Sequence, residues 1–323
     1  MHVHPLIAAL RSDPASQRRS QAVMEDSIAA WRSGEQVAAL ESDLRSFGCG
    51  ASLGDLPALE TLMFDHKRAI GFADRFNQAV IAGLHREPLG EAPLRHTLRD
   101  GFSHLQLMQS GGATLSICAY EPVVDPRQPV SAQFADCEIF EIVVSGEARG
   151  EFYNLEPLGS GAVRIETTPM LLIAGDRVHR RARQDSRQLL TVTRSLLALQ
   201  LSRVPKTPGP AYEYRLSDAA LINQVSGDKK ASEKMMALAV LGALGHRDGL
   251  GAMDAFATNS DHDLDARWEA VRQILAMDTQ RGMDLLGRLA SMKADALAQP
   301  ASNLIQHLHT IEPALSHKQE EHA

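Results

Sequence analysis

Charged side chains gather between residues 136 and 187, and their types suit the binding of an anion. The arginines of this segment are Arg177, Arg180, Arg181, Arg183 and Arg187. Guanidinium groups bind carboxylates and phosphates through paired hydrogen bonds, so these side chains could hold an anionic ligand or an acidic partner. A solvated strand face with alternating side chains explains them at least as well. We take Arg177 and Arg181 as candidate ligand-binding residues.

Three carboxylates precede these arginines. Asp136, Glu138 and Glu141 lie in or beside an apolar segment that reads as a strand. Glu138 and Glu141 are three residues apart, so they face opposite sides of a strand and at most one of them faces inward. An inward carboxylate needs a partner, because an unpaired buried charge is costly. Asp136 and Glu141 are therefore further candidates for ligand binding.

The composition is that of a soluble globular protein with a sizeable core. The chain has 323 residues, 44% hydrophobic and 23% charged. A net charge of -7 argues against binding to nucleic acid or to an anionic membrane. The cysteines, Cys49, Cys118 and Cys137, are few and widely spaced, which favours a reducing compartment. With no secretion signal at its start and no apolar run that could span a bilayer, the expected location is the cytoplasm.

The hydrophobic pattern changes twice along the chain. Residues 1–92 show helical periodicity, and residues 93–204 alternate with a period of two. Pro205, Pro208 and Pro210 mark a linker over residues 205–216. Residues 217–323 return to helical periodicity. We expect an α+β protein in which an N-terminal helical segment and a C-terminal helical domain flank a β domain.

Short strands with frequent turns fill the β domain. The runs 104–109 and 114–120 lie on either side of Gly111-Gly112, which predicts a hairpin. Further strands are expected over 138–144 and 148–154, separated by a turn at Ser145-Gly146. This density of strands and turns is typical of an antiparallel β-barrel or jelly roll.

The C-terminal domain contains an internal repeat. Residues 237–257 match residues 270–290 in their apolar positions at an offset of about 33, a length common among helical repeats. Each unit would be two helices, and neighbouring units must stack to bury their apolar faces. The pattern resembles HEAT-type repeats, which present extended surfaces to protein partners.

Two segments of the β domain resemble the cupin family. The segment Phe140–Tyr153, with Gly146 at its turn, is similar to the end of the first cupin motif, and Ile173–His179 is similar to the second. The order of these segments behind N-terminal helices resembles the cysteine-dioxygenase-like branch. The resemblance covers roughly a third of the chain and implies a cupin barrel.

The resemblance also implies a metal site, which this sequence only partly retains. His179 occupies the position of a metal-binding histidine, whereas Ala132 and Phe134 stand where two further histidines are usual. A reduced set of His179, His104 and a carboxylate such as Glu138 could still hold a metal, and iron(II) would suit an oxygenase. The simpler interpretation of His179 is an ordinary residue at the edge of a strand.

Two functions follow from these observations. The first is a non-catalytic, cupin-like protein without a cofactor, which binds a small anionic ligand or, through its helical repeats, a protein partner. The alternative is an iron-dependent oxygenase of the thiol-dioxygenase-like class. Phosphate-binding glycine loops, a GxSxG elbow and an HExxH motif are absent from the sequence.

Overall fold

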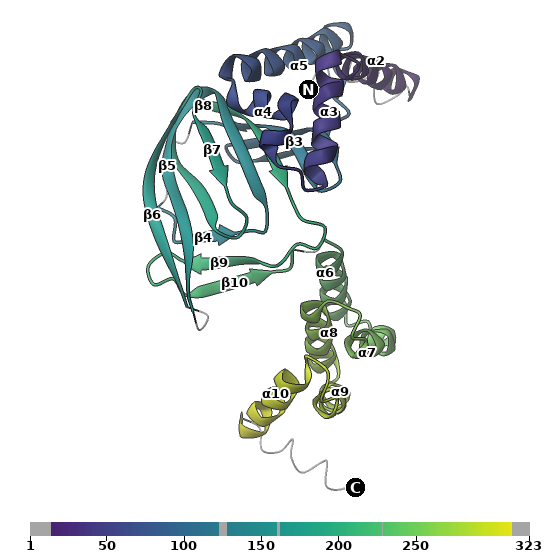
Figure 1. The fold of residues 1–323 in the computed structure, drawn as a ribbon. Coiled ribbons are helices and arrows are strands. Elements are labelled where there is room, and N and C mark those ends of the chain that lie inside the picture. Colours follow the sequence, from purple (N-terminus) through teal and green to yellow (C-terminus); the bar gives the residue numbers. More distant parts are fainter. Residues whose placement is uncertain (1–13, 123–127, 160–161, 228, 312–323) are drawn as a thin grey trace, which may run out of the picture. The chain divides into compact units, whose positions relative to one another are not determined.

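The computed structural model describes residues 14–122, 128–159, 162–227 and 229–311. The chain divides into two compact units, Met1–Gln224 and Val225–Ala323, which we describe separately. Figure 1 shows that the first unit combines helices with antiparallel strands, and that the second is helical. None of the helices in the described ranges is long and apolar enough to cross a membrane.

The first unit begins with helices that bury one apolar side each. Trp31 packs against Phe72 and Phe76 with ring centroids 5.7 and 5.2 Å apart. Asp65 begins the longest of these helices, because its carboxylate accepts hydrogen bonds from the backbone N–H groups of Lys67 and Arg68. The helices are α2 (Pro14–Arg32), α3 (Glu35–Gly48), η1 (Leu53–Asp55), α4 (Pro57–Phe64) and α5 (His66–Arg86).

The strands of the first unit form two sheets. The larger, seven-stranded sheet has the order β1-β2-β3-β8-β5-β6, with β7 paired to β5, and the smaller has the order β10-β9-β4. All of these pairings are antiparallel where their direction is described. The strands are β1 (His96–Arg99), β2 (Phe102–Ser110), β3 (Ala113–Tyr120), β4 (Ser131–Phe134), β5 (Glu138–Gly159), β6 (Ala162–Ile173), β7 (Arg177–Arg180), β8 (Asp185–Arg203), β9 (Ala211–Arg215) and β10 (Leu221–Val225).

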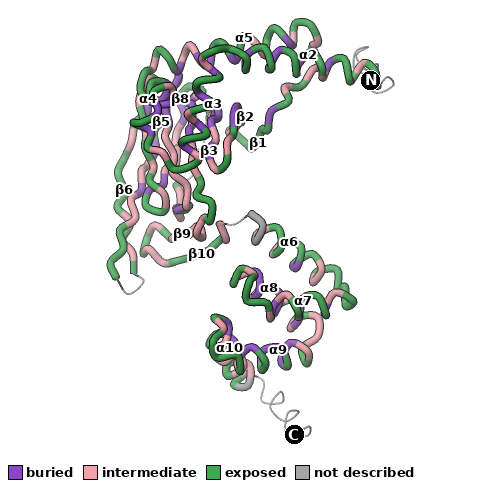
Figure 2. The backbone as a smooth tube through the Cα atoms, turned by 45° about the vertical axis from the view of Figure 1, so that its right-hand side comes forward, coloured by how far each residue is buried: buried purple, intermediate pink, exposed green. Residues whose placement is uncertain are grey.

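The helices cover one face of the larger sheet. Leu115 of β3, Ile142 of β5 and Leu199 of β8 belong to the same buried apolar cluster as Phe47 and Phe72 of the helices. In Figure 2, buried residues gather where α3 and α4 meet the strands. The helices and the sheet therefore bury their apolar surfaces in one common core. We call this side of the sheet the helix face. The opposite side, which the helices do not cover, is called the open face, although Glu141, Val143 and Leu196 on it are buried.

The expected closed barrel is wrong, although the antiparallel α+β architecture is confirmed. Within the described residues, β1 and β6 lie at opposite ends of the larger sheet and do not pair with each other. The sheet therefore stays open, and β4 pairs with β9 in the separate smaller sheet. The expected turn at Gly146 is also absent, because β5 runs unbroken from Glu138 to Gly159.

Strands also occur in segments that we expected to be linker and helical domain. β9 lies within residues 205–216, where Tyr212 and Tyr214 pair with Phe134 and Ala132 of β4. β10 follows within the predicted helical domain. The division between the compact units falls after Gln224. The prolines of this segment indicated a linker. The segment forms a strand instead, because β9 pairs with β4, which is distant in the sequence.

The second unit is a small helical domain with its own core. Leu250, Val271, Ile274, Leu286 and Leu289 are among its buried residues. The helix pair α6–α7 falls on the first of the two matching sequence segments, and the pair α8–α9 falls on the second. That these pairs are HEAT-type repeats stays a prediction. The helices are α6 (Lys229–Ala243), η2 (Arg247–Gly249), α7 (Leu250–Thr258), α8 (Leu264–Met277), α9 (Thr279–Ser291) and α10 (Ala298–Ile311).

Candidate ligand-binding site

The pairing of β5 decides which of its carboxylates faces which side. From Glu138 to Val143 this strand pairs with β8 without a shift in register. Side chains therefore alternate, so Glu138 lies on the helix face together with Ile142, and Glu141 lies on the open face. The two carboxylates have separate surroundings and separate partners.

A group of polar side chains surrounds Glu141 on the open face. Gln200 lies directly opposite Glu141, and Ser116 lies directly opposite Gln200. Residues opposed in antiparallel strands share a face, so β3, β5 and β8 all contribute to this group. We define the Glu141 cluster as Ser116, Cys118, Tyr120, Glu141, Arg180, Arg187 and Gln200.

Two arginines neutralise Glu141 in this cluster. Arg187 donates from Nη2 to Oε1 of Glu141 at 2.7 Å and to the hydroxyl of Tyr120 at 3.2 Å. Arg180 lies 3.3 Å from the other carboxylate oxygen, Oε2. The side chains of Glu141 and Arg187 are only 3% and 5% exposed, so this ion pair is shielded from water. Charges shielded from water attract each other strongly, and removing one of them would leave the other buried without compensation.

Burial and charge set the protonation states of the cluster. Burial by itself would raise the pKa of Glu141, but the charges of Arg180 and Arg187, together with the hydrogen bond from Arg187, outweigh it and hold the pKa below its usual value. Burial, reinforced by the carboxylate of Glu141, raises the pKa of the Cys118 thiol to about 12. Burial also raises the pKa of Tyr120. At neutral pH the cluster therefore contains a carboxylate, a thiol and a phenol.

Several buried polar atoms of this cluster have no hydrogen-bond partner. They are Oγ of Ser116, Oε2 of Glu141, Nε of Arg180, and Nε and Nη1 of Arg187. Within the described residues, every buried side-chain nitrogen or oxygen without a partner belongs to this one cluster. Native proteins satisfy nearly all such groups, with water or a ligand where the protein supplies no partner.

The helix face carries a different group of charges around Glu138. His179 stacks on Phe140 with centroids 4.1 Å apart, and its Nε2 lies 3.1 Å from Oε1 of Glu138. Arg203 donates to the other oxygen of Glu138 at 2.5 Å and to the backbone carbonyls of Phe47 and Ala51. Arg203 thus joins the end of α3 to the sheet.

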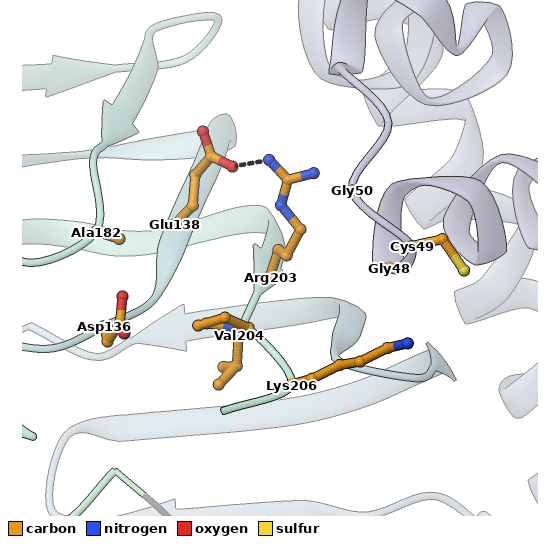
Figure 3. A pocket seen from close by; sticks show the side chains of 10 residues that line it. Gly48, Cys49, Gly50, Asp136, Glu138, Ala182, Arg203, Val204 and Lys206 are labelled. Atoms are coloured by element: carbon orange, nitrogen blue, oxygen red, sulfur yellow. Dashed lines mark hydrogen bonds and ion pairs between the residues drawn. The ribbon is translucent and has the colours of Figure 1, made fainter. Parts of the chain in front are cut away.

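A cleft of about 530 Å³ opens beside Arg203 (Figure 3). Its lining includes Cys49, Asp136, Glu138 and Lys206. The size is within the range of small-molecule sites. Asp136, however, already accepts hydrogen bonds from Arg183 at 2.7 Å and from the backbone of Gly209 at 2.8 Å. Because Glu138 and Arg203 also pair with each other, the charges of this cleft are largely satisfied.

Of the three expected metal ligands, His179 and Glu138 lie together, but His104 does not join them. His104 lies directly opposite Cys118 in the β2–β3 pairing and therefore faces the open side, whereas His179 and Glu138 face the helices. The pKa of His104 is lowered by burial. Within the ranges that the structure describes, no three side chains of His, Cys, Asp or Glu are grouped so that they could hold a metal ion. The donor set does not fit the iron of the alternative hypothesis.

The remaining candidate arginines have local partners. Arg181 is bound by Asp185, which accepts from its Nε at 2.7 Å and from its Nη2 at 2.9 Å. The guanidinium of Arg177 lies 5.1 Å from the ring centroid of Phe64. Of the proposed ligand-binding residues, only Glu141 is part of the Glu141 cluster. Arg180 and Arg187 belong to the basic patch predicted to hold an anion, although only Arg177 and Arg181 were singled out as ligands. Tyr120 was not predicted, although Ser116, Cys118 and Tyr120 recur on alternate positions of one strand.

Comparisons with known proteins show partial similarities of structure. No protein-family model matches the chain, and no curated protein matches it. The 7S globulin of Momordica charantia is similar at 13% identity and a TM-score of 0.27, over 38% of this chain and 35% of its own, so this chain spans about a third of that globulin. Drosophila melanogaster CENP-C bound to CAL1 is similar at 12% identity and a TM-score of 0.27, over 40% of this chain and 96% of its own.

A cupin superfamily protein from Desulfitobacterium hafniense is also similar, at 11% identity and a TM-score of 0.24, over 33% of this chain and 82% of its own. Cupin proteins are thus among the solved structures that this chain partly resembles. The more specific resemblance to the cysteine-dioxygenase-like branch stays a prediction.

Proposed function

We propose that this chain is a non-catalytic binding protein of cupin-like architecture that holds a small polar ligand in the Glu141 cluster. One observation supports the proposal: in the part of the chain that the structure describes, the buried side-chain nitrogen and oxygen atoms without partners all belong to this one cluster. A buried donor or acceptor left without a partner costs about 1–3 kcal/mol. A bound molecule that satisfies several of these atoms would recover much of that cost.

The test is a crystal structure of the full chain purified in a buffer without small carboxylates or phosphate, combined with mass spectrometry of molecules released on denaturation. We expect a bound molecule in contact with Arg187 and its release on unfolding. The matched control is Arg187→Gln, in which the released molecule should be lost. A cluster filled by ordered water alone, with nothing released, would contradict the proposal.

Metal content separates this function from an iron-dependent oxygenase. Because His104 and His179 face opposite sides of the sheet, we expect less than one equivalent of iron or manganese per chain. Elemental analysis after aerobic and anaerobic purification measures this directly. Stoichiometric metal that disappears in His179→Ala would favour the oxygenase instead.

A second candidate function is the binding of a protein partner by the C-terminal helices. On and just after α6, the side chains of Met236, Val240 and Leu244 are 69%, 51% and 74% exposed and recur every four residues. Exposed apolar patches of this kind favour contact with an apolar surface. A partner captured by the full chain and then purified should lose its affinity for the double variant Met236→Glu/Leu244→Glu. Undiminished binding would contradict this function.

A further inference from the structure

We infer that the ligand of the Glu141 cluster is a small monoanion with an apolar body, of the class of short-chain carboxylates. This inference rests on the proposed function and names the chemistry that the site selects. Three features of the open face support it: net charge, unpaired donors and apolar neighbours.

The charges of the cluster do not balance. Arg180 and Arg187 contribute two positive charges, and Glu141 contributes one negative charge. The side chains of these residues are 18%, 5% and 3% exposed, so water compensates the excess positive charge poorly. A buried site with one surplus positive charge favours a ligand with a single negative charge.

The unpaired atoms are mostly donors. Nε and Nη1 of Arg187 and Nε of Arg180 are N–H groups without an acceptor. A guanidinium can only donate, so these groups need oxygen acceptors from a bound molecule. A carboxylate has several acceptor positions, and hydrogen bonds between ions are shorter and stronger than those between neutral groups.

Apolar side chains adjoin the cluster on the same face. Val143 is two residues beyond Glu141, Val178 lies directly opposite Glu141, and Leu196 lies directly opposite Tyr120. Val143 and Leu196 are buried in one apolar cluster, against which Tyr120 and Val178 pack. Such surroundings favour a ligand that has an aliphatic part behind its charged group, and disfavour a fully polar oxyanion.

The first experiment compares butyrate, butyramide and inorganic phosphate by calorimetric titration of the full chain. Butyramide has nearly the shape of butyrate but no charge, and phosphate has charge but no apolar part. We expect butyrate to bind at least about tenfold more tightly than butyramide, which lacks one charge-assisted hydrogen bond. We expect the same margin over phosphate, which has no apolar part to contact the aliphatic side chains.

Each outcome distinguishes the inference from the proposed function. If butyramide binds as tightly as butyrate, the ligand does not need a negative charge. If phosphate binds as tightly as butyrate, the ligand does not need an apolar part. Either result would overturn the inference. If butyrate fails to bind while the crystal structure contains another molecule at Arg187, the inference fails and the function stands. If the crystal structure contains only water there, both fail.

Two substitutions in the cluster should act in opposite directions. Glu141→Gln removes the competing carboxylate and should tighten butyrate binding, whereas Arg180→Gln removes the surplus positive charge and should weaken it, each by about tenfold. Disrupted folding can only weaken binding, so tightening in Glu141→Gln is specific to the electrostatic argument.

The controls Glu166→Gln and Arg149→Gln change the same charges at exposed positions of β6 and β5 and should leave affinity unchanged. Weaker binding in Glu141→Gln, with folding intact, would overturn the inference.

Discussion

The three thiols of this chain differ in their exposure, and two of them have raised pKa values. Cys49 is exposed, whereas Cys118 is buried and its pKa is raised to about 12. Burial also raises the pKa of the partly buried Cys137. Since the thiolate is the reactive form, we expect one fast-reacting thiol per native chain at pH 8, measured with a colorimetric thiol reagent.

The variant Cys49→Ser identifies that thiol. It should remove the fast phase and leave the two slow thiols, which should react only on denaturation. A fast phase that persists in Cys49→Ser would mean that Cys118 or Cys137 is accessible and ionised in the native protein.

At the scale of single residues, the sequence predicted part of the candidate site. The alternation of a strand separates Glu138 from Glu141, and the register of β5 has them on opposite faces. The partners of Glu141 could not be derived in this way. Arg187 lies 46 residues away and is opposite Phe152 in the β5–β8 pairing, whereas Glu141 is opposite Gln200, so their contact requires the long pair of strands to curve back on itself. His104 and His179 lie on opposite faces of the sheet, and their spacing in the sequence does not reveal this because it does not give the register of β2 and β7.

Among the elements, β5 depends on a glycine at its bend. Gly146 has a φ of +97°, and a Cβ there would overlap the carbonyl oxygen of Ser195 and lie 2.7 Å from Cα of Leu196. Both contacts are backbone atoms of β8, which cannot move independently. We expect Gly146→Ala to lower the free energy of unfolding by at least about 3 kcal/mol, measured by chemical denaturation.

Gly101 is the matched control for this prediction. Its φ is +72°, but a Cβ there would meet nothing within 4 Å. Gly101→Ala should therefore cost only the backbone term of about 1–2 kcal/mol. Equal losses in the two variants would contradict the close approach of β5 and β8 at Gly146.

In the second unit, Arg267 of α8 holds three segments together. It donates from Nε to the carbonyl of Ala257 at 2.8 Å and from Nη2 to the carboxylate of Asp295 at 2.6 Å. The side chains of Arg267 and Asp295 are each 3% exposed. Removing one partner leaves a buried charge alone, so Arg267→Ala should destabilise the protein by about 3–5 kcal/mol in denaturant titrations.

Arg272 on the same helix provides the comparison. Its side chain is 65% exposed and pairs with Glu269. Exposed ion pairs contribute about 0–1 kcal/mol, so Arg272→Ala should have little effect. A comparable loss in both variants would show that helix propensity, and not the buried pair, dominates.

The sequence predicted the elements better than their connections. The hairpin across Gly111 is present as β2 and β3, and the helical periodicity within residues 1–92 is present as α2, α3, α4 and α5. The predicted turn at Gly146 is wrong, because the prediction rested on the rule that a glycine after an apolar run usually marks a turn. Here it adopts a positive φ inside one long strand, at a point where the β5–β8 register shifts. Such an irregularity depends on the neighbouring strand and leaves no local signal.

For the whole molecule, acid should reduce stability through carboxylates in both units. Hydrogen bonds and charge hold the pKa of Asp295 below its ordinary 3.8, mainly through Arg267. For Asp185 and Glu141, burial opposes the effect but arginine partners prevail, so both pKa values also lie below the ordinary 3.8 and 4.5. The unfolded chain therefore takes up these protons first.

The sign of the effect follows from this order of protonation. Stability from these groups is complete above the ordinary pKa values and is lost as the pH falls through the lower, folded values. Between pH 7 and about pH 5 these carboxylates add no pH dependence, whereas His104, whose pKa burial lowers, already reduces stability as the pH falls through its ordinary 6.5. Below about pH 4 we expect the free energy of unfolding to fall further because of the carboxylates, with a shallower fall in Asp185→Asn. An unchanged acid slope in that variant would contradict the role of Asp185.

The long β5–β8 pairing has a consequence for how a newly made chain acquires its structure. Glu138 pairs with Arg203, 65 residues later, and Leu199 and Leu201 of β8 complete the core that covers the N-terminal helices. While the ribosome is still adding residues before 199, those helices have no finished sheet to pack against. Their apolar sides are then open to chaperones, and a chain truncated at that length should aggregate.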